Sequence, residues 1–335
     1  MRDRVKGYLK RILPPTTLML DRRVDQLLEE NRVLRDRVGE VSQELSVIRA
    51  ELYSLRADSL RERIRERSST ELEGSPETVV SIASYGPRVP FIAPMIESLG
   101  RQSIQPDRAF LWLPTKDFPG GVDDLPADVL CALYDANVEP RFVGEDLGPH
   151  NKYFWTMKAF SESVVVTLDD DVRYPKSLLE RLLDAHRAWP AEVVAMRARV
   201  IAVEDKRPAP YETWPLELGD LVGRPSFGVV GTGVGGALYP PHCLDDHVFD
   251  IEGIRSACPR ADDLWLKIMS VIAGTMTVCP TGDCPLDYLP GTQETALCDE
   301  NLYQGGNDAQ LAAILEYVSA FTDVGDILRK ISETV

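Results

Sequence analysis

The chain has 335 residues, of which 44% are hydrophobic, so it is long enough to bury a large core without disulfide staples. Acidic residues outnumber basic ones by 53 to 37, which gives a net charge of −16. The charge is uneven, because residues 1–72 hold 16 Lys and Arg against 13 Asp and Glu, whereas residues 73–335 hold 21 against 40. Phosphate contacts with nucleic acid require a basic surface, so this balance excludes nucleic acid as a partner of the acidic part.

Residues 1–20 form a basic tail that ends near the pair Pro14-Pro15. Two interpretations fit it: peripheral contact with the anionic inner face of the cell membrane, or a disordered segment. No apolar run reaches the roughly 18 residues of a membrane-spanning helix, and no signal peptide is evident. We therefore expect a cytoplasmic protein whose six cysteines are reduced.

Residues 21–66 carry the heptad pattern of a parallel coiled coil. With Val24 at position a, every a and d position through Leu55 is aliphatic except Asn31. A buried Asn at an a position pairs best with its own copy, which favours a parallel dimer. Positions g and e′ agree, because they form the opposite-charge pairs Glu30/Arg35, Glu44/Arg49 and Glu51/Arg56. The alternative is a single amphipathic helix that lies on the following domain. We expect the helix to fray from residue 57 and residues 67–76 to form a linker.

Residues 77–325 alternate between strand and helix patterns, which predicts one α/β domain. Continuous apolar strands are typical of a mainly parallel, Rossmann-like sheet covered by helices on both faces. In such sheets, ligands bind beyond the carboxyl ends of the strands. Helices are expected after Pro90, Pro149 and Pro175, and strands at 78–83, 109–113, 138–143, 164–168 and 193–201.

The most informative motif is VVVTLDDDV, in which three carboxylates follow a buried strand. Three adjacent like charges repel, and a divalent cation such as Mg²⁺ or Mn²⁺ is the usual counter-charge for oxygen ligands of this kind. If the strand alternation continues, Asp169 and Asp171 share a side, while Asp170 faces away. The alternative is an acidic turn that caps the helix after Pro175.

Three other motifs carry polar groups. Asp262 and Asp263 begin a predicted helix that ends at Gly274; one of them could act as a general base, or both could simply complement the helix dipole. Lys152 lies near a predicted helix start, where it could meet a phosphate or be solvated. Residues 227–240 are glycine-rich and favour a β-bulge or hairpin near an acceptor, and Asn301 to Asp308 form a polar cluster or a helix start.

Taken together, the ordered motifs SIASYG, LGPHNKY, TLDDD, GVGGALY and DDLWLK resemble family-2-type glycosyltransferases with the GT-A fold. The resemblance covers residues 78–310 and is nearest to bacterial enzymes of polysaccharide and cell-surface glycan synthesis. It implies transfer of a sugar from a nucleotide-sugar donor to a glycan or lipid-linked hydroxyl acceptor, with inversion.

The resemblance also implies roles for individual residues. Asp263, paired with Asp262, would be the catalytic base, and Asp169 and Asp171 would hold Mn²⁺ or Mg²⁺ against the donor diphosphate. The other donor-binding residues would be Ser84, Tyr85, Arg88, Lys152, Asp170, Gly235 and Gly236. Many enzymes of this fold supply a further metal ligand, often His, after the acidic helix. This chain has no His there, so water or Asp308 would complete the shell.

Two alternatives use the same residues differently. A nucleotidyltransferase would need a glycine-rich and basic loop after the first strand, and SYGPRVP matches this weakly. A non-catalytic scaffold would join the coiled coil to an inactive transferase-like domain. Metal-dependent binding of UDP or GDP distinguishes the transferase from the scaffold.

Overall fold

The computed structural model describes residues 15–282, 284–292 and 306–334. The basic tail before residue 15, Cys298 and Asn301 lie outside the described residues, so the predictions made for them stay predictions. The chain divides into two compact units, Met1–Leu55 and Arg56–Val335. None of the described helices combines the length and the apolar character needed to cross a bilayer.

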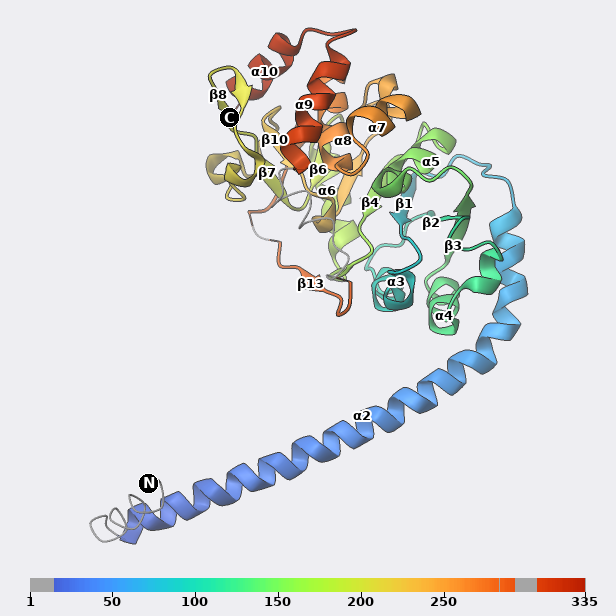
Figure 1. The fold of residues 1–335 in the computed structure, drawn as a ribbon, viewed down its shortest axis with the longest axis vertical. Helices are drawn as coiled ribbons and strands as arrows, with labels where there is room; N and C mark the ends of the chain where they lie inside the picture. Colours follow the sequence, from blue (N-terminus) through green and yellow to red (C-terminus); the bar gives the residue numbers. More distant parts are fainter. Residues whose placement is uncertain (1–14, 283, 293–305, 335) are drawn as a thin grey trace. The chain divides into compact units, whose positions relative to one another are not determined.

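One long helix, α2 (Pro15–Ser69), contains the predicted heptads (Figure 1). Within the first unit the apolar heptad residues are exposed, from 49% at Leu27 to 78% at Leu55. The predicted helix is therefore present, whereas its pairing with a second helix stays a prediction.

The end of α2 belongs to the second unit and does not fray. Ala57, Leu60 and Ile64 are buried at helical spacing, and Arg65 Nη2 lies 2.7 Å from Asp123 Oδ1. The expectation of fraying from residue 57 is wrong, because these three apolar side chains pack on the domain. The linker begins after Ser69.

The predicted mainly parallel sheet is confirmed. Its seven strands run in the order β12-β6-β11-β4-β1-β2-β3, and only β11 is antiparallel to its neighbours. Short strand pairs lie outside it: β10 with β7, β13 with β5, and β8 with β9. The strands are β1 (Thr78–Ala83), β2 (Arg108–Pro114), β3 (Val138–Val143), β4 (Val164–Leu168), β5 (Val172–Arg173), β6 (Val193–Ala195), β7 (Ala198–Val200), β8 (Val203–Glu204), β9 (Arg207–Pro208), β10 (Val229–Gly231), β11 (Ala237–Tyr239), β12 (Thr277–Val278) and β13 (Asp287–Tyr288).

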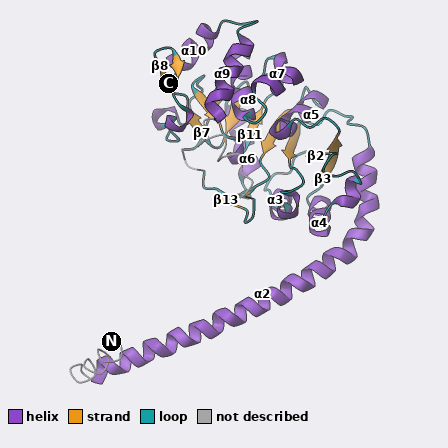
Figure 2. Cartoon of the chain, in the orientation of Figure 1, coloured by secondary structure: helices purple, strands orange, loops and turns teal. Residues whose placement is uncertain are grey.

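Helices cover both faces of this sheet (Figures 1 and 2). Figure 1 shows α3 and α4 on one side of β1 to β3, and α5 on the other side. The helices are α3 (Ala93–Gly100), α4 (Ala127–Asp135), α5 (Asn151–Ala159), α6 (Leu178–Ala188), α7 (Ile251–Ala257), α8 (Asp262–Ala273), α9 (Gly306–Val318) and α10 (Val324–Glu333).

Two predicted elements differ from the structure. The single strand expected at 193–201 is divided into β6 and β7, which belong to different sheets. Of the β-bulge or hairpin expected in the glycine-rich segment, the hairpin is absent, because β10 and β11 belong to different sheets and the 3-10 turn η6 (Gly233–Gly235) connects them. The two differences meet in space, because a Cβ at Gly235 would lie 2.5 Å from Arg197 Cβ, so this turn packs directly on the break between β6 and β7.

A lysine inside α8 makes stability depend on pH. Lys267 is 4% exposed and its Nζ lies 3.1 Å from Thr277 Oγ1. Burial lowers the pKa of Lys267 to about 7, with Glu192 opposing the shift. In the unfolded chain a lysine keeps its proton to about pH 10. Between these two values only the unfolded state holds the proton, so the free energy of unfolding rises as the pH rises through this window.

We predict that Lys267→Met removes this dependence. From pH 7 to pH 9 the wild-type chain should gain stability relative to the variant by up to about 1.4 kcal/mol per pH unit. Urea unfolding at both pH values measures the difference. The exposed Lys176→Met is the matched control and should behave as the wild type. Equal pH slopes for wild type and Lys267→Met would contradict a lysine that is neutral in the folded state.

Candidate active site

The acidic triplet follows β4, directly beside the end of β1. The two strands are parallel neighbours with Ile82 opposite Leu168, so the residues that follow them meet at the carboxyl edge of the sheet. Ser84 Oγ donates a hydrogen bond of 2.5 Å to Asp170 Oδ2. Burial raises the pKa of Asp170 to about 6, although Arg88 acts in the opposite direction.

Arg88, in the turn after β1, joins two of the three acids. Its Nη1 lies 3.0 Å from Asp170 Oδ1 and its Nη2 lies 2.8 Å from Asp171 Oδ2. The predicted alternation, with Asp169 and Asp171 on one side and Asp170 on the other, is therefore wrong. The strand ends at Leu168, so the period of two does not extend into the turn that carries the acids.

Lys152 joins the remaining acid of the triplet to a second element. Its Nζ lies 2.7 Å from Asp169 Oδ1 and 2.8 Å from Asp262 Oδ2, and the residue is 6% exposed. Burial alone would lower the pKa of this lysine, but Asp169, Asp262 and Asp263 raise it well above its usual value. Lys152 is thus a buried member of the acid cluster, and the solvated alternative is wrong.

Asp262 and Asp263 lie in the first turn of α8, as predicted. Both oxygens of Asp263 accept a hydrogen bond of 3.1 Å from the N–H of Gly233. Burial, followed by the charge of Asp262, raises the pKa of Asp263 to about 7. Burial also raises the pKa of Asp262, against the effect of Lys152.

The site thus gathers five carboxylates around two basic groups. Arg88 and Lys152 leave three negative charges in excess when all five acids are ionised. The sequence predicted that a metal ion balances the charge of the acids, whereas Arg88 and Lys152 supply part of the positive charge. Burial is the main cause of the raised pKa values of Asp170 and Asp263, and the neighbouring carboxylates raise them further.

The carboxylate oxygens of this site are suitable ligands for a hard divalent cation. The side chains of Asp169 and Asp171 are 28% and 14% exposed, against 5% for Asp170 and 9% for Asp262. Among the described residues no three His, Cys, Asp or Glu side chains converge as a complete metal cage. Mg²⁺ commonly takes one or two carboxylates and completes its shell with water and substrate phosphates, so a full cage is not required.

The glycine that contacts the acids is Gly233, which sequence reasoning did not select. A Cβ there would lie 2.6 Å from Lys152 Nζ and 3.0 Å from Asp169 Oδ1. The two selected glycines have packing partners instead: Gly235 faces Arg197, and Gly236, with φ +88°, faces Leu168. Their role at the sugar and acceptor stays a prediction.

Two further residues at this edge were missed. The Tyr174 hydroxyl accepts a hydrogen bond of 2.9 Å from the Asp169 N–H and donates one of 3.2 Å to the Asp169 carbonyl, which fixes the turn. Arg197 follows β6, which is parallel to β4 because both are antiparallel to β11, so it reaches the same edge. The Arg197 Nη1 donates to Thr232 Oγ1 at 2.9 Å. Arg197 was missed because it lies within residues 193–201, which the sequence pattern predicts as one continuous strand.

Tyr85 and Asp308, which were predicted to bind the nucleotide and to complete the metal shell, have other contacts in the structure. Tyr85 is 37% exposed in the turn after β1, and its carbonyl accepts the N–H groups of Arg88 and Val89. Asp308 lies at the start of α9, where its Oδ1 accepts a hydrogen bond of 2.8 Å from the Tyr211 N–H. This contact supports the helix-start interpretation of Asp308 rather than a place in the metal shell.

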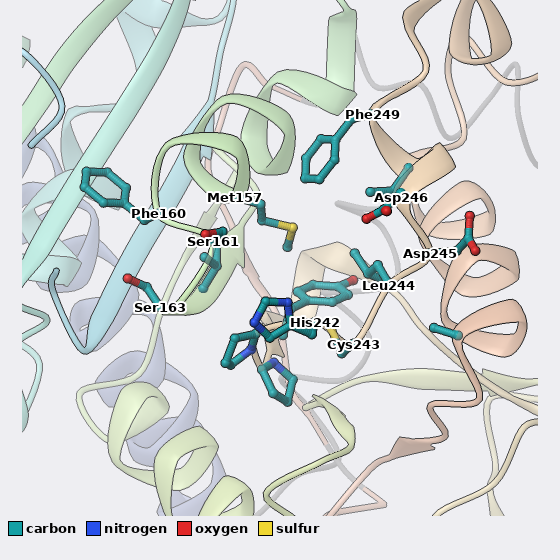
Figure 3. A pocket seen from close by; sticks show the side chains of 16 residues that line it. Met157, Phe160, Ser161, Ser163, His242, Cys243, Leu244, Asp245, Asp246 and Phe249 are labelled. Atoms are coloured by element: carbon teal, nitrogen blue, oxygen red, sulfur yellow. The ribbon is translucent and has the colours of Figure 1, made fainter.

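A cavity of about 410 Å³ lies at the opposite end of β4, where Ser163 and Val165 contribute to its wall (Figure 3). Figure 3 shows Met157, Leu244 and Phe249 among its apolar lining. None of the five acids lines this cavity. It is separate from the acid cluster, because Asp169 follows the other end of the same strand.

No family model and no curated protein matches the sequence. Among solved structures, the chain is similar to TarS of S. aureus, with 13% identity and a TM-score of 0.40 over 73% of this chain and 44% of TarS. It thus spans less than half of that protein. It is also similar to the mannosyltransferase PcManGT of Pyrobaculum calidifontis, solved with GDP-Man and Mn²⁺ (11% identity, TM-score 0.41, 85% of this chain and 90% of that one).

A third similar structure is CMP:2-keto-3-deoxy-manno-octonic acid synthetase complexed with CTP, with 13% identity and a TM-score of 0.37 over 60% of this chain and 88% of that one. At these identities and TM-scores the likenesses carry no argument about function, which rests on the site itself.

We predict that Gly233→Ala disrupts the site without unfolding the protein. The added Cβ would push the charged ends of Lys152 and Asp169 out of place, while the backbone around them is spared. Titration with UDP or GDP in the presence of Mn²⁺ should show affinity reduced at least about tenfold, or about 1.4 kcal/mol, with the far-ultraviolet helix signal retained.

The matched control is Gly144→Ala, where no heavy atom lies within 4 Å of the added Cβ. It should bind as the wild type does. If Gly233→Ala binds nucleotide equally well, the positions of Lys152 and Asp169 do not determine binding.

Proposed function

We propose that this protein is a glycosyltransferase that moves a sugar from a nucleoside-diphosphate sugar to a hydroxyl acceptor. The observation that carries the proposal is the convergence of five carboxylates, Lys152 and Arg88 at the carboxyl edge of a mainly parallel sheet. Ligands of such sheets bind at this edge. The motif resemblance supports the same reaction, with inversion and a glycan or lipid-linked acceptor in cell-surface polysaccharide synthesis.

The donor half of the site consists of the turns after β1 and β4. Three excess negative charges would repel a diphosphate, so donor binding needs an additional cation. Asp169 and Asp171 would hold Mn²⁺ or Mg²⁺, which supplies positive charge to the departing nucleoside diphosphate when bound. Arg88 holds Asp171 in place, and Ser84 holds Asp170.

The acceptor half consists of α8 and the turn at Gly233. Asp262 is engaged by Lys152, whereas both carboxylate oxygens of Asp263 accept a hydrogen bond from the Gly233 N–H. Asp263 is therefore the base. As the acceptor oxygen bonds to the anomeric carbon, the bond from that carbon to the diphosphate breaks. The acceptor proton passes to Asp263, and the nucleoside diphosphate leaves with the bonding electrons.

Other proposed contacts follow the same division. Ser84, Tyr85 and Arg88 adjoin the nucleotide, and Gly235 and Gly236 border the sugar and the acceptor. Arg197 extends the basic groups of this edge toward the acceptor half, because its backbone packs against Gly235.

A nucleotidyltransferase remains the second candidate, and its product distinguishes it. Its loop after β1 would bind a triphosphate, yet Arg88, the basic residue of SYGPRVP, is already engaged by Asp170 and Asp171. Release of a nucleoside diphosphate from a nucleotide sugar supports the transferase. Release of pyrophosphate from a nucleoside triphosphate and a sugar phosphate would support the nucleotidyltransferase.

We predict that Mn²⁺ tightens the binding of UDP or GDP at least about tenfold, or about 1.4 kcal/mol. Asp171→Asn preserves shape and removes one charge, so it should abolish this dependence. Calorimetric titration with and without Mn²⁺ measures both effects.

The control for this titration is Asp184→Asn, which removes an acid with 62% side-chain exposure on α6. It should keep the full effect of Mn²⁺. Nucleotide binding that ignores Mn²⁺ would argue against the cation, and absence of nucleotide binding at any Mn²⁺ concentration would argue against the transferase.

We also predict that Asp263→Asn separates chemistry from binding. General-base catalysis contributes about 10²–10⁴-fold, so kcat should fall by that factor while nucleotide affinity is retained. Asp262→Asn should differ, because it removes a partner of Lys152 and weakens nucleotide binding as well. Equal kcat in wild type and Asp263→Asn, once a donor and an acceptor are identified, rules out Asp263 as the base.

A further inference from the structure

The first unit presents an apolar stripe that nothing in the described chain covers. Val24, Leu27, Leu34, Val38, Val41, Leu45, Ile48, Leu52 and Leu55 are each at least 49% exposed, and they occupy the a and d positions of consecutive heptads. Polar Asn31 is the single exception in the stripe. A stripe of period 3.5 on a long helix matches the seam of a coiled coil, in which each side chain inserts between four residues of a facing helix.

The charges that flank the stripe favour a copy of the same helix in parallel orientation. In a parallel pair, Glu30 and Glu44 at g positions meet Arg35 and Arg49 at the e positions of the partner. In an antiparallel pair, g faces g and e faces e, so the arginines at e positions could meet no glutamate, and a glutamate at a g position would meet another glutamate unless it faces Arg37. In the parallel pair Arg37 meets the uncharged Ser42, so the parallel arrangement keeps more opposite-charge pairs.

The same helix changes its apolar face where the second unit begins. Counted in the same frame, the buried residues Ala57, Leu60 and Ile64 fall at positions f, b and f, on the side opposite to the stripe. The stripe ends at Leu55, and the next residue, Arg56, donates from both terminal nitrogens to Asp135 at 2.7 and 2.5 Å. The third predicted pair, Glu51/Arg56, therefore competes with a contact inside the second unit.

We propose that residues 24–55 bind a second copy of this chain as a parallel, in-register, two-stranded coiled coil. The a and d side chains form its seam, Asn31 pairs with its own copy, and the zipper ends at Leu55. The two catalytic domains of the proposed function are thereby held in one particle. The pairing uses no residue of the acid cluster, so it stands or fails independently of that function.

Adjacent residues provide a matched test. Ile48 at d and Val47 at c are both branched aliphatics, exposed by 53% and 55%, but only Ile48 lies in the stripe. Light scattering coupled to size exclusion, on the full chain at micromolar concentration, should give twice the mass of one chain for the wild type and for Val47→Glu. Ile48→Glu should give the mass of one chain, with nucleotide binding and the far-ultraviolet helix signal retained.

A monomeric wild type, a dimeric Ile48→Glu or a trimeric wild type would each overturn the proposal. Orientation is tested by Leu27→Cys, because a d residue lies opposite its own copy only in a parallel register. Mild oxidation should join the two chains through Leu27→Cys, whereas Val33→Cys, at a c position, should give no more crosslinking than the wild type. A dimer in which Leu27→Cys does not crosslink would overturn the parallel register.

Discussion

The buried ammonium group of Lys152 holds together the acids at the carboxyl edge of the sheet. Lys152 Nζ lies between Asp169, at the end of β4, and Asp262, at the start of α8, so one side chain from α5 connects three elements that are far apart in the sequence. A buried lysine costs desolvation energy that only close, well-placed carboxylates repay. Removing one partner from such a pair typically costs about 3–5 kcal/mol, so the position of each acid depends on this lysine.

The same constraint explains the rest of the site. Arg88 gives Asp170 and Asp171 a shared partner, Tyr174 fixes the backbone of Asp169, and Gly233 leaves room for the lysine where any larger residue would meet it. The acids are therefore positioned before any ligand arrives. Positions fixed in advance avoid reorganisation during the reaction, which is where much electrostatic catalysis arises. The basic groups are too few for the acids, so the site holds its carboxylates in place with an excess of negative charge, on which the proposed cation depends.

Much of the fold could be predicted from the sequence because apolar runs and helix punctuation are local signals. The strands at 78–83, 138–143 and 164–168 agree with the structure residue for residue, and Gly274 ends α8 in the left-handed conformation, as its place after an apolar helix face indicates. The break between β6 and β7 could not be predicted, because the residues there are mostly apolar, as in a continuous strand, and the turn at Gly235 that packs on Arg197 is distant in the sequence. The burial of Ala57, Leu60 and Ile64 was missed for a related reason. Polar and charged residues separate these three residues in the sequence, and their shared apolar face becomes evident only where it packs on the domain.

For the candidate site, the sequence indicated which residues come together but not how they pair. The acids, Ser84, Arg88 and Lys152 meet at the carboxyl edge of the sheet, since strand ends in a parallel sheet converge, and their roles there stay a prediction. Which basic side chain pairs with which acid depends on side chains that reach across three elements. Strand alternation did not predict these pairs, because the strand ends at Leu168. Gly233 and Arg197 carried no local signal that separated them from their neighbours.

The most direct test of the central claim is a crystal structure of the chain with Mn²⁺ and a nucleoside diphosphate, using the anomalous signal of manganese. We predict a manganese peak between the diphosphate and the carboxylates of Asp169 or Asp171, with Lys152 still between Asp169 and Asp262. A nucleotide bound far from this edge, with the five acids facing only Lys152 and Arg88, would contradict it.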